Sequence, residues 1–68
     1  MYYRIADEYI SLYNYRGLFM GATLSPGEIF IILDKYCYVN EGRYVVLTAS
    51  TLIRHVLASR VENASRCI

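Results

Sequence analysis

The segment Ser25-Pro-Gly-Glu-Ile-Phe-Ile-Ile-Leu33 carries the clearest fold signal in the chain. Pro26 and Gly27 are typical of a tight turn, and the β-branched and aromatic residues at 28–33 predict a buried strand directly after it. Gly27 suits a turn position with a positive φ angle, which glycine adopts without steric cost. The segment therefore predicts a turn that leads into a core strand of a β protein.

A hairpin is predicted immediately downstream. The residues at 36–39 (Tyr-Cys-Tyr-Val) and at 43–48 (Arg-Tyr-Val-Val-Leu-Thr) each have strand-forming composition. Asn40-Glu41-Gly42 lies between them and is typical of a short hairpin turn, with Gly42 at a positive φ angle.

The N-terminal part contains one further strand signal. Tyr9–Tyr13 predicts a strand, and the following residues 16–23, with two glycines, predict an irregular loop. Residues 1–8 fit either the start of a short helix or a lead-in segment to the strand. Residues 63–68 are expected to be a C-terminal tail.

Residues 50–61 fit two structures. Their apolar positions have helical spacing, with Ser50 available as the N-cap, at Leu52, Ile53, Val56, Leu57 and Val61. The alternative is a strand over 52–57, entered through a turn at 48–51 and followed by one helical turn at 58–60. The short strands and turn signals elsewhere in the chain favour the strand.

Length and composition restrict the class of protein. The 68 residues make a single domain with a small core, since a chain of about this length buries only roughly 60% of its unfolded surface. The longest apolar run, Ile29–Leu33, is too short to cross a membrane. The net charge of +1 argues against duplex DNA or an anionic membrane as partner. Cys37 and Cys67 are expected to be reduced thiols, which indicates a cytoplasmic protein.

Three segments together resemble Src-homology-3 (SH3) domains. Ser11-Leu-Tyr-Asn-Tyr15 resembles the Ala-Leu-Tyr-Asp-Tyr signature of that family, and Leu24–Leu33 resembles its Leu-Ser…Gly-Glu stretch with the strand that follows. His55–Val61 resembles the closing aromatic-Ile-Pro-Ser-Asn-Tyr-Val segment. The resemblance spans roughly 9–62. It implies an all-β fold, a small SH3-like barrel of about five short strands with one 3₁₀ turn near Ala58–Arg60.

The same resemblance implies a partner-binding groove. The residues that correspond to it are Tyr13, Tyr15, Tyr44, Leu57 and Arg60. The chain departs from the family pattern, because it has no Trp and carries Asn14 in place of the signature Asp. Leu57 and Arg60 also replace the family's ligand-contacting Pro and Tyr. These departures argue against proline-rich peptides as ligands.

No catalytic or cofactor-binding pattern is present in the sequence. His55 is the only histidine and has no evident nucleophile or base partner, and the glycines lack the spacing of a phosphate-binding loop. We therefore expect no enzyme activity, no cofactor and no metal site.

The eight tyrosines favour a non-enzymatic protein-interaction module that binds a protein partner through a Tyr-lined face. They equally fit strand formers that cover a small core. A homodimer is expected from the apolar composition. One alternative is a nucleic-acid-binding barrel that uses Tyr stacking and Arg–phosphate contacts through Arg54, Arg60 and Arg66. Another is a structural subunit of a larger assembly. A stand-alone phage, viral or bacterial accessory protein in the (host) cytoplasm fits each of these functions.

Overall fold

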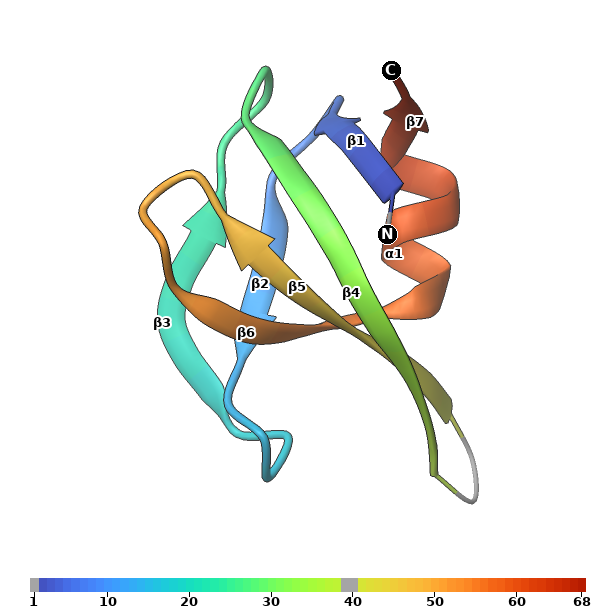
Figure 1. Cartoon of the computed structure of the whole chain (residues 1–68). Coiled ribbons are helices and arrows are strands. Elements are labelled where there is room, and N and C mark those ends of the chain that lie inside the picture. The colour runs from blue at the N-terminus through green and yellow to red at the C-terminus, as the bar shows by residue number, and fades with distance from the viewer. Residues whose placement is uncertain (1, 39–40) are drawn as a thin grey trace.

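The computed structural model describes residues 2–38 and 41–68 and shows a mostly antiparallel β fold with one short helix (Figure 1). The described residues form one seven-stranded sheet in the order β3-β2-β6-β5-β4-β1-β7. The element bounds are β1 (Tyr2–Ala6), β2 (Ile10–Tyr13), β3 (Phe19–Leu24), β4 (Ile29–Tyr38), β5 (Glu41–Thr48), β6 (Ile53–Leu57), α1 (Ala58–Ala64) and β7 (Ser65–Cys67). The predicted all-β class is thus confirmed.

β4 and β5 form the long hairpin that the sequence predicts, although its first arm is continuous. The two strands predicted at 28–33 and 36–39 are parts of one ten-residue strand, which pairs with β5 from Phe30↔Thr48 to Tyr38↔Glu41. A register shift between Ile32 and Asp34 marks a bulge within it. Gly42 lies inside β5 rather than in the turn. Val39 and Asn40 lie outside the described residues.

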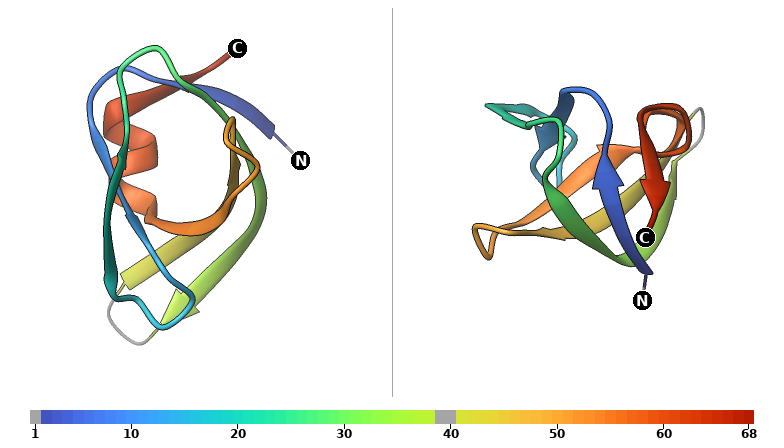
Figure 2. Two further views of the ribbon diagram at one scale, coloured as in Figure 1. Left: turned by 90° about the vertical axis from the view of Figure 1, so that its left-hand side faces the viewer. Right: turned by 90° about the horizontal axis from the view of Figure 1, so that it is seen from above.

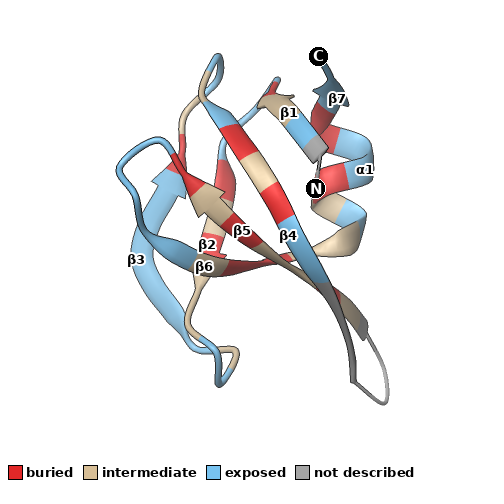
Figure 3. Cartoon of the chain, viewed as in Figure 1, coloured by how far each residue is buried: buried red, intermediate tan, exposed pale blue. Residues whose placement is uncertain are grey.

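The core lies on one face of the sheet, which curls around it while α1 packs from the same side (Figure 2). Buried residues alternate with more exposed ones along β4, as Figure 3 shows. This period of two places Phe30 and Ile32 inward together with Val46 on β5. The buried hydrophobic residues are Ala6, Ile10, Leu12, Leu24, Phe30, Ile32, Val46, Val56, Val61 and Ala64.

The structure decides between the helix and the strand that the sequence allowed at 50–61. Residues 53–57 pair with 43–47 of β5 as an antiparallel strand, so the predicted strand is correct there. The single 3₁₀ turn predicted near Ala58–Arg60 is wrong, because an α-helix runs on to Ala64. Val61 and Ala64, one turn apart, are both buried, and this apolar contact with the core extends the helix.

Both chain ends belong to the sheet, which corrects the predicted lead-in segment at 1–8 and the predicted tail at 63–68. β1 pairs with β4 on one side and with β7 on the other. The region predicted as a loop at 16–23 is also partly a strand, because β3 pairs with β2. β3 buries only Leu24, so its sequence lacks the alternation by which a strand is recognised.

The expected barrel of about five strands is not what the structure shows. The order of hydrogen-bonded strands begins at β3 and ends at β7, and these two edge strands do not pair with each other. The described residues form seven strands. The β2–β3 hairpin joins the rest of the sheet through the single pair Tyr13↔His55. The fold is therefore an open, curled sheet whose first hairpin has one registered strand pair with β6 and packs on the core through Ile10, Leu12 and Leu24.

Two glycines occupy positions that few other residues could take. Gly27 has a φ of 91° in the turn between β3 and β4, as predicted, and its amide donates to the Ala6 carbonyl at 2.8 Å. Gly17 has a φ of 84° between β2 and β3, and a Cβ there would lie 2.6 Å from Nη1 of Arg43. The β2–β3 turn thus lies directly against the buried Arg43 side chain.

Candidate functional site

The outer face of the sheet, opposite the core, carries a continuous row of apolar side chains. Strand pairing aligns Tyr3 with Ile31, Ile31 with Leu47, and Leu47 with Ile53, across β1, β4, β5 and β6. Directly opposed residues of an antiparallel sheet point to the same face, so the four side chains lie side by side. We call Tyr3, Ile31, Leu47 and Ile53 the outer band.

The two end residues of the outer band are exposed to solvent, and its two middle residues are half-buried. Tyr3 is 57% exposed and Ile53 is 58% exposed, whereas Ile31 and Leu47 are half-buried between them. The helix α1 does not cover this face, because it packs on the core side against β2, β5, β6 and β7. The band is therefore an apolar surface available to a partner.

A second row of side chains borders the outer band on one side. It pairs Asp34 with Val45, Val45 with His55, and His55 with Tyr13. Tyr13 pairs in turn with Phe19, and their rings meet edge to face with centroids 6.0 Å apart. On the other side Ile29 lies next to Ile31 along β4 and pairs with Ile5. Ile29 and Ile5 thus extend the apolar surface on one side, whereas the row on the other side mixes Val45 and Tyr13 with Asp34 and the buried His55.

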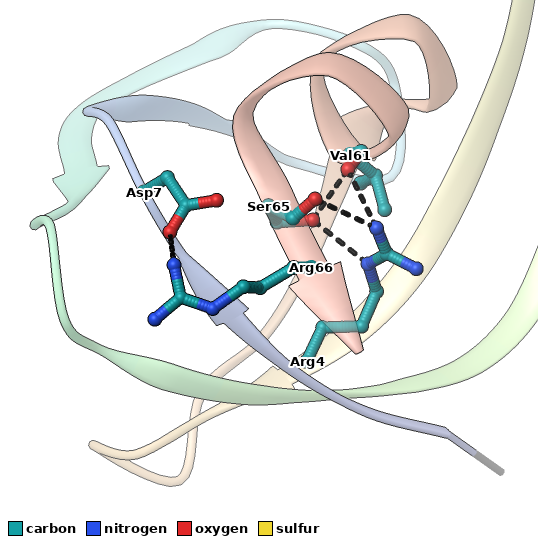
Figure 4. Close-up of polar contacts among 5 residues, drawn as sticks. All are labelled: Arg4, Asp7, Val61, Ser65 and Arg66. Atoms are coloured by element: carbon teal, nitrogen blue, oxygen red, sulfur yellow. Dashed lines mark hydrogen bonds and ion pairs between the residues drawn. The ribbon is translucent and has the colours of Figure 1, made fainter. Parts of the chain in front are cut away.

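The charged groups described on this face lie at its margins. Asp34 is exposed on β4 beyond Leu33, and Arg66 of β7 lies opposite Ile5. Arg66 forms an ion pair with Asp7 (Figure 4). Arg43 lies opposite Leu57 and is buried. A partner could therefore contact the band without burying a described charged side chain.

Tyr13 and Tyr15 lie near this face, at the end of β2 and in the turn after it. Tyr13 is half-buried between Phe19 and His55. Tyr15 is 67% exposed, and its hydroxyl accepts a hydrogen bond from Nε of Arg16 at 3.1 Å. The Arg16 guanidinium also lies 5.5 Å from the centroid of the Tyr15 ring.

Tyr44, Leu57 and Arg60 lie elsewhere, so the five predicted groove residues do not meet in one groove. Tyr44 faces the core side of β5, packs against the core, and lies 3.4 Å from Oε1 of Glu62 through its hydroxyl. Leu57 is half-buried at the end of β6 on the outer side. Arg60 extends from α1 to the link between β1 and β2, where it donates to the Tyr9 carbonyl at 2.9 Å. The binding role of these five residues stays a prediction.

His55 is a buried histidine in the second row. Desolvation by burial lowers the pKa of His55 below its ordinary value of 6.5, and the nearby positive charge of Arg43 lowers it further. Both effects disfavour the protonated ring in the folded chain. His55 is thus a packing residue that is neutral at pH 7.

Acidification should destabilise the protein through His55. The unfolded chain takes up a proton near pH 6.5, whereas the folded chain resists it, so the unfolded state binds more protons below that pH. The free energy of unfolding is then highest above the pKa of His55 in the unfolded chain, and it decreases as the pH falls below that value. Urea unfolding monitored by circular dichroism between pH 7.5 and 5.5 should show this decrease. His55→Gln should flatten the dependence, and an equally steep slope in that variant would assign the effect to other groups.

Arg4 forms the densest polar cluster of the described residues, and its role is structural (Figure 4). Its guanidinium donates to Ser65 Oγ at 2.8 Å, to the Ser65 carbonyl at 2.8 Å and to the Val61 carbonyl at 3.2 Å. A fourth contact, of 3.1 Å, reaches Sγ of Cys67. Arg4 therefore satisfies carbonyls at the C-terminal end of α1 and fixes β7 beside β1.

We did not predict the outer band from the sequence, although the sequence contains a signal for it. The strand 28–33 was expected to be buried, yet Ile29 is 46% exposed and Leu33 is 38% exposed. A strand of a sheet with one wet face normally alternates apolar and polar residues, whereas an unbroken apolar run is typical of a strand covered on both faces. Here the described chain buries Arg43 and His55 on the outer face but leaves Ile29 and Leu33 exposed. The outward side chains of the run Ile29–Leu33 are therefore apolar and have no full covering layer among the described residues.

The one helix of the described residues, α1, is too short to cross a membrane. No protein-family model, curated protein or solved structure matches the chain.

Proposed function

We propose that the protein is a non-enzymatic protein-interaction module whose outer band binds an apolar surface of a partner protein. The observation that carries this proposal is the uninterrupted row of Tyr3, Ile31, Leu47 and Ile53 on the face opposite the core. Patches of this kind on small monomeric domains commonly mark interaction sites. Tyr3 supplies an amphipathic ring at one end, a residue type enriched in interfaces.

The size of the row sets the strength expected of such binding. The outer band with the residues that flank it on each strand covers four strands about 4.8 Å apart and about five residues of about 3.3 Å each, a face of roughly 300 Å² in plan. Burying that area on both partners at about 25 cal/mol per Å² gives roughly 15 kcal/mol before the cost of association. Association itself costs about 4–15 kcal/mol. The difference of about 0 to 11 kcal/mol spans the range from no measurable binding to a dissociation constant of about 10 nM. Tyr13 with Phe19 could extend the contact.

The arrangement of arginines favours a protein over a nucleic acid as partner. Arg4 binds the end of α1, Arg66 pairs with Asp7, and Arg43 is buried. Arg60 donates to the Tyr9 carbonyl and lies 3.6 Å from Glu8. A phosphate-binding surface needs guanidinium groups directed outward together. The same band would serve a structural subunit of a larger assembly. SH3 kinship and a cytoplasmic location stay predictions, and the proposal rests on neither.

Affinity purification from the native source with matched variants tests this function. We expect a protein that co-purifies with the tagged wild-type chain to be lost with Ile53→Lys, which places a charge in the outer band. Leu18→Lys is the matched control, because Leu18 is 61% exposed but lies in the turn before β3. Both variants should retain the wild-type circular dichroism spectrum.

The outcome separates the outer band from surface hydrophobicity in general. Loss of the partner with Ile53→Lys but not with Leu18→Lys supports the band as the binding site. Equal loss with both variants, or loss with Leu18→Lys alone, would place binding elsewhere and contradict the proposal.

A further inference from the structure

We infer that one occupant of the outer band is a second copy of this chain, in a weak dimer that stacks the two sheets face to face. This inference rests on the proposed function, because it uses the same band and names its partner. It also accounts for the apolar run Ile29–Leu33, whose outward side lacks a covering layer within the described chain. The second copy would provide that layer.

The band is complementary to itself. In a face-to-face pair of sheets the two-fold axis lies in the plane between them, either along the strands or across them. An axis along the strands, between β4 and β5, places Tyr3 over Ile53 of the other copy and Ile31 over Leu47. An axis across the strands places each of the four residues over its own equivalent. Either arrangement brings apolar side chains together.

Charge does not oppose this association. The chain has a net charge of +1, so two copies repel each other only weakly. Asp34 and Arg66, the charged residues described at the margins of the face, lie outside the row of four. A charged side chain in the row would instead have been buried without a partner in the dimer.

The buried area indicates a weak dimer. Two faces of roughly 300 Å² each would bury about 600 Å² in total, which lies below the standard size of about 1,600 Å² for stable complexes. We expect a dissociation constant of the order of 100 µM, as for a small transient interface. Self-association of this strength would compete only weakly with a partner that covers more of the face.

Sedimentation equilibrium between 10 µM and 1 mM tests the inference on the full chain. A reductant is required, because the exposed Cys67 could otherwise form an intermolecular disulfide. The wild-type chain should show a concentration-dependent rise towards twice its monomer mass. Ile31→Thr combined with Ile53→Thr should raise the dissociation constant at least tenfold. Leu18→Ser should leave it unchanged.

Three results would overturn the inference: a monomer at 1 mM, a dimer that the double variant leaves intact, or a dimer that Leu18→Ser dissociates. Each is distinguishable from failure of the proposed function. A chain that stays monomeric but loses a different co-purifying protein with Ile53→Lys would retain the binding site and reject only the second copy.

Discussion

Replacing Phe30 with Ala should unfold most of the protein at 25 °C, whereas replacing its neighbour Ile29 with Thr should leave it folded. Phe30 is fully buried against the core, and truncating a buried Phe to Ala typically costs about 3–5 kcal/mol. A small core supplies stability of about that size in total. Ile29 is the adjacent residue of β4 but faces the outer side, where it is 46% exposed.

Urea unfolding of the two variants measures this difference between the faces. Ile29→Thr keeps a β-branched residue in the strand and should cost about 1 kcal/mol or less. Phe30→Leu provides a folded reference, with an expected loss of about 1 kcal/mol and an unchanged m-value. Equal losses for Phe30→Ala and Ile29→Thr would mean that both faces of β4 are buried. That result would remove the basis for the outer band.

Replacing Arg4 with Met should lower the free energy of unfolding by about 2–4 kcal/mol. The substitution keeps an unbranched apolar stem but removes a partly buried set of charge-assisted hydrogen bonds, each worth about 1.5–3 kcal/mol when intact. It also leaves the Val61 and Ser65 carbonyls without this donor. The loss should appear first as fraying of α1 and β7, detectable as faster amide exchange there.

Two further variants show whether the Arg4 effect is specific. Arg4→Lys should recover only part of the stability, because an ammonium cannot present the planar set of donors that contacts Ser65 and Val61. Arg16→Met removes an exposed arginine whose contacts are local to Tyr15, and should change stability by less than about 0.5 kcal/mol. If Arg4→Met and Arg16→Met were equally mild, Arg4 would not fix the C-terminal elements.

Local patterns in the sequence predicted the middle of the fold correctly. The turn at Gly27, the strand that follows and the strand at 43–48 all rely on neighbouring residues, namely turn chemistry and strand-forming side chains. The preference for a strand at 52–57 was also correct. Here helical spacing was locally plausible, and pairing with β5 overrode it.

The edges of the sheet were missed because their stability comes from distant residues. β1 contains Arg4, which looks unsuitable for an inward position until its partners at 61–67, nearly the whole chain away, are known. β3 buries a single residue and so lacks a periodic signal. The barrel of about five strands followed from the resemblance to SH3 domains, which spans roughly 9–62 and so leaves out β1 and β7.

The five predicted groove residues lie apart for a related reason. Tyr13 and Tyr44 both have strand spacing that permits either face, and only the registers Tyr13↔His55 and Tyr44↔Val56 show that they face opposite sides. A tyrosine suits a core margin and an interface equally well. The outer band, in contrast, depends on which face of each strand α1 and the curled sheet leave uncovered. That property belongs to the packing of the whole chain.

Photo-crosslinking from the outer band tests its role most directly. A benzophenone amino acid at Ile53, introduced in the cells that naturally make the protein, should give discrete protein adducts on irradiation, including one at twice the mass of the chain if the second copy binds. The same group at Asn63, exposed on α1, should give few adducts. Adducts from Asn63 without adducts from Ile53 would contradict the assignment of the outer band as the binding surface.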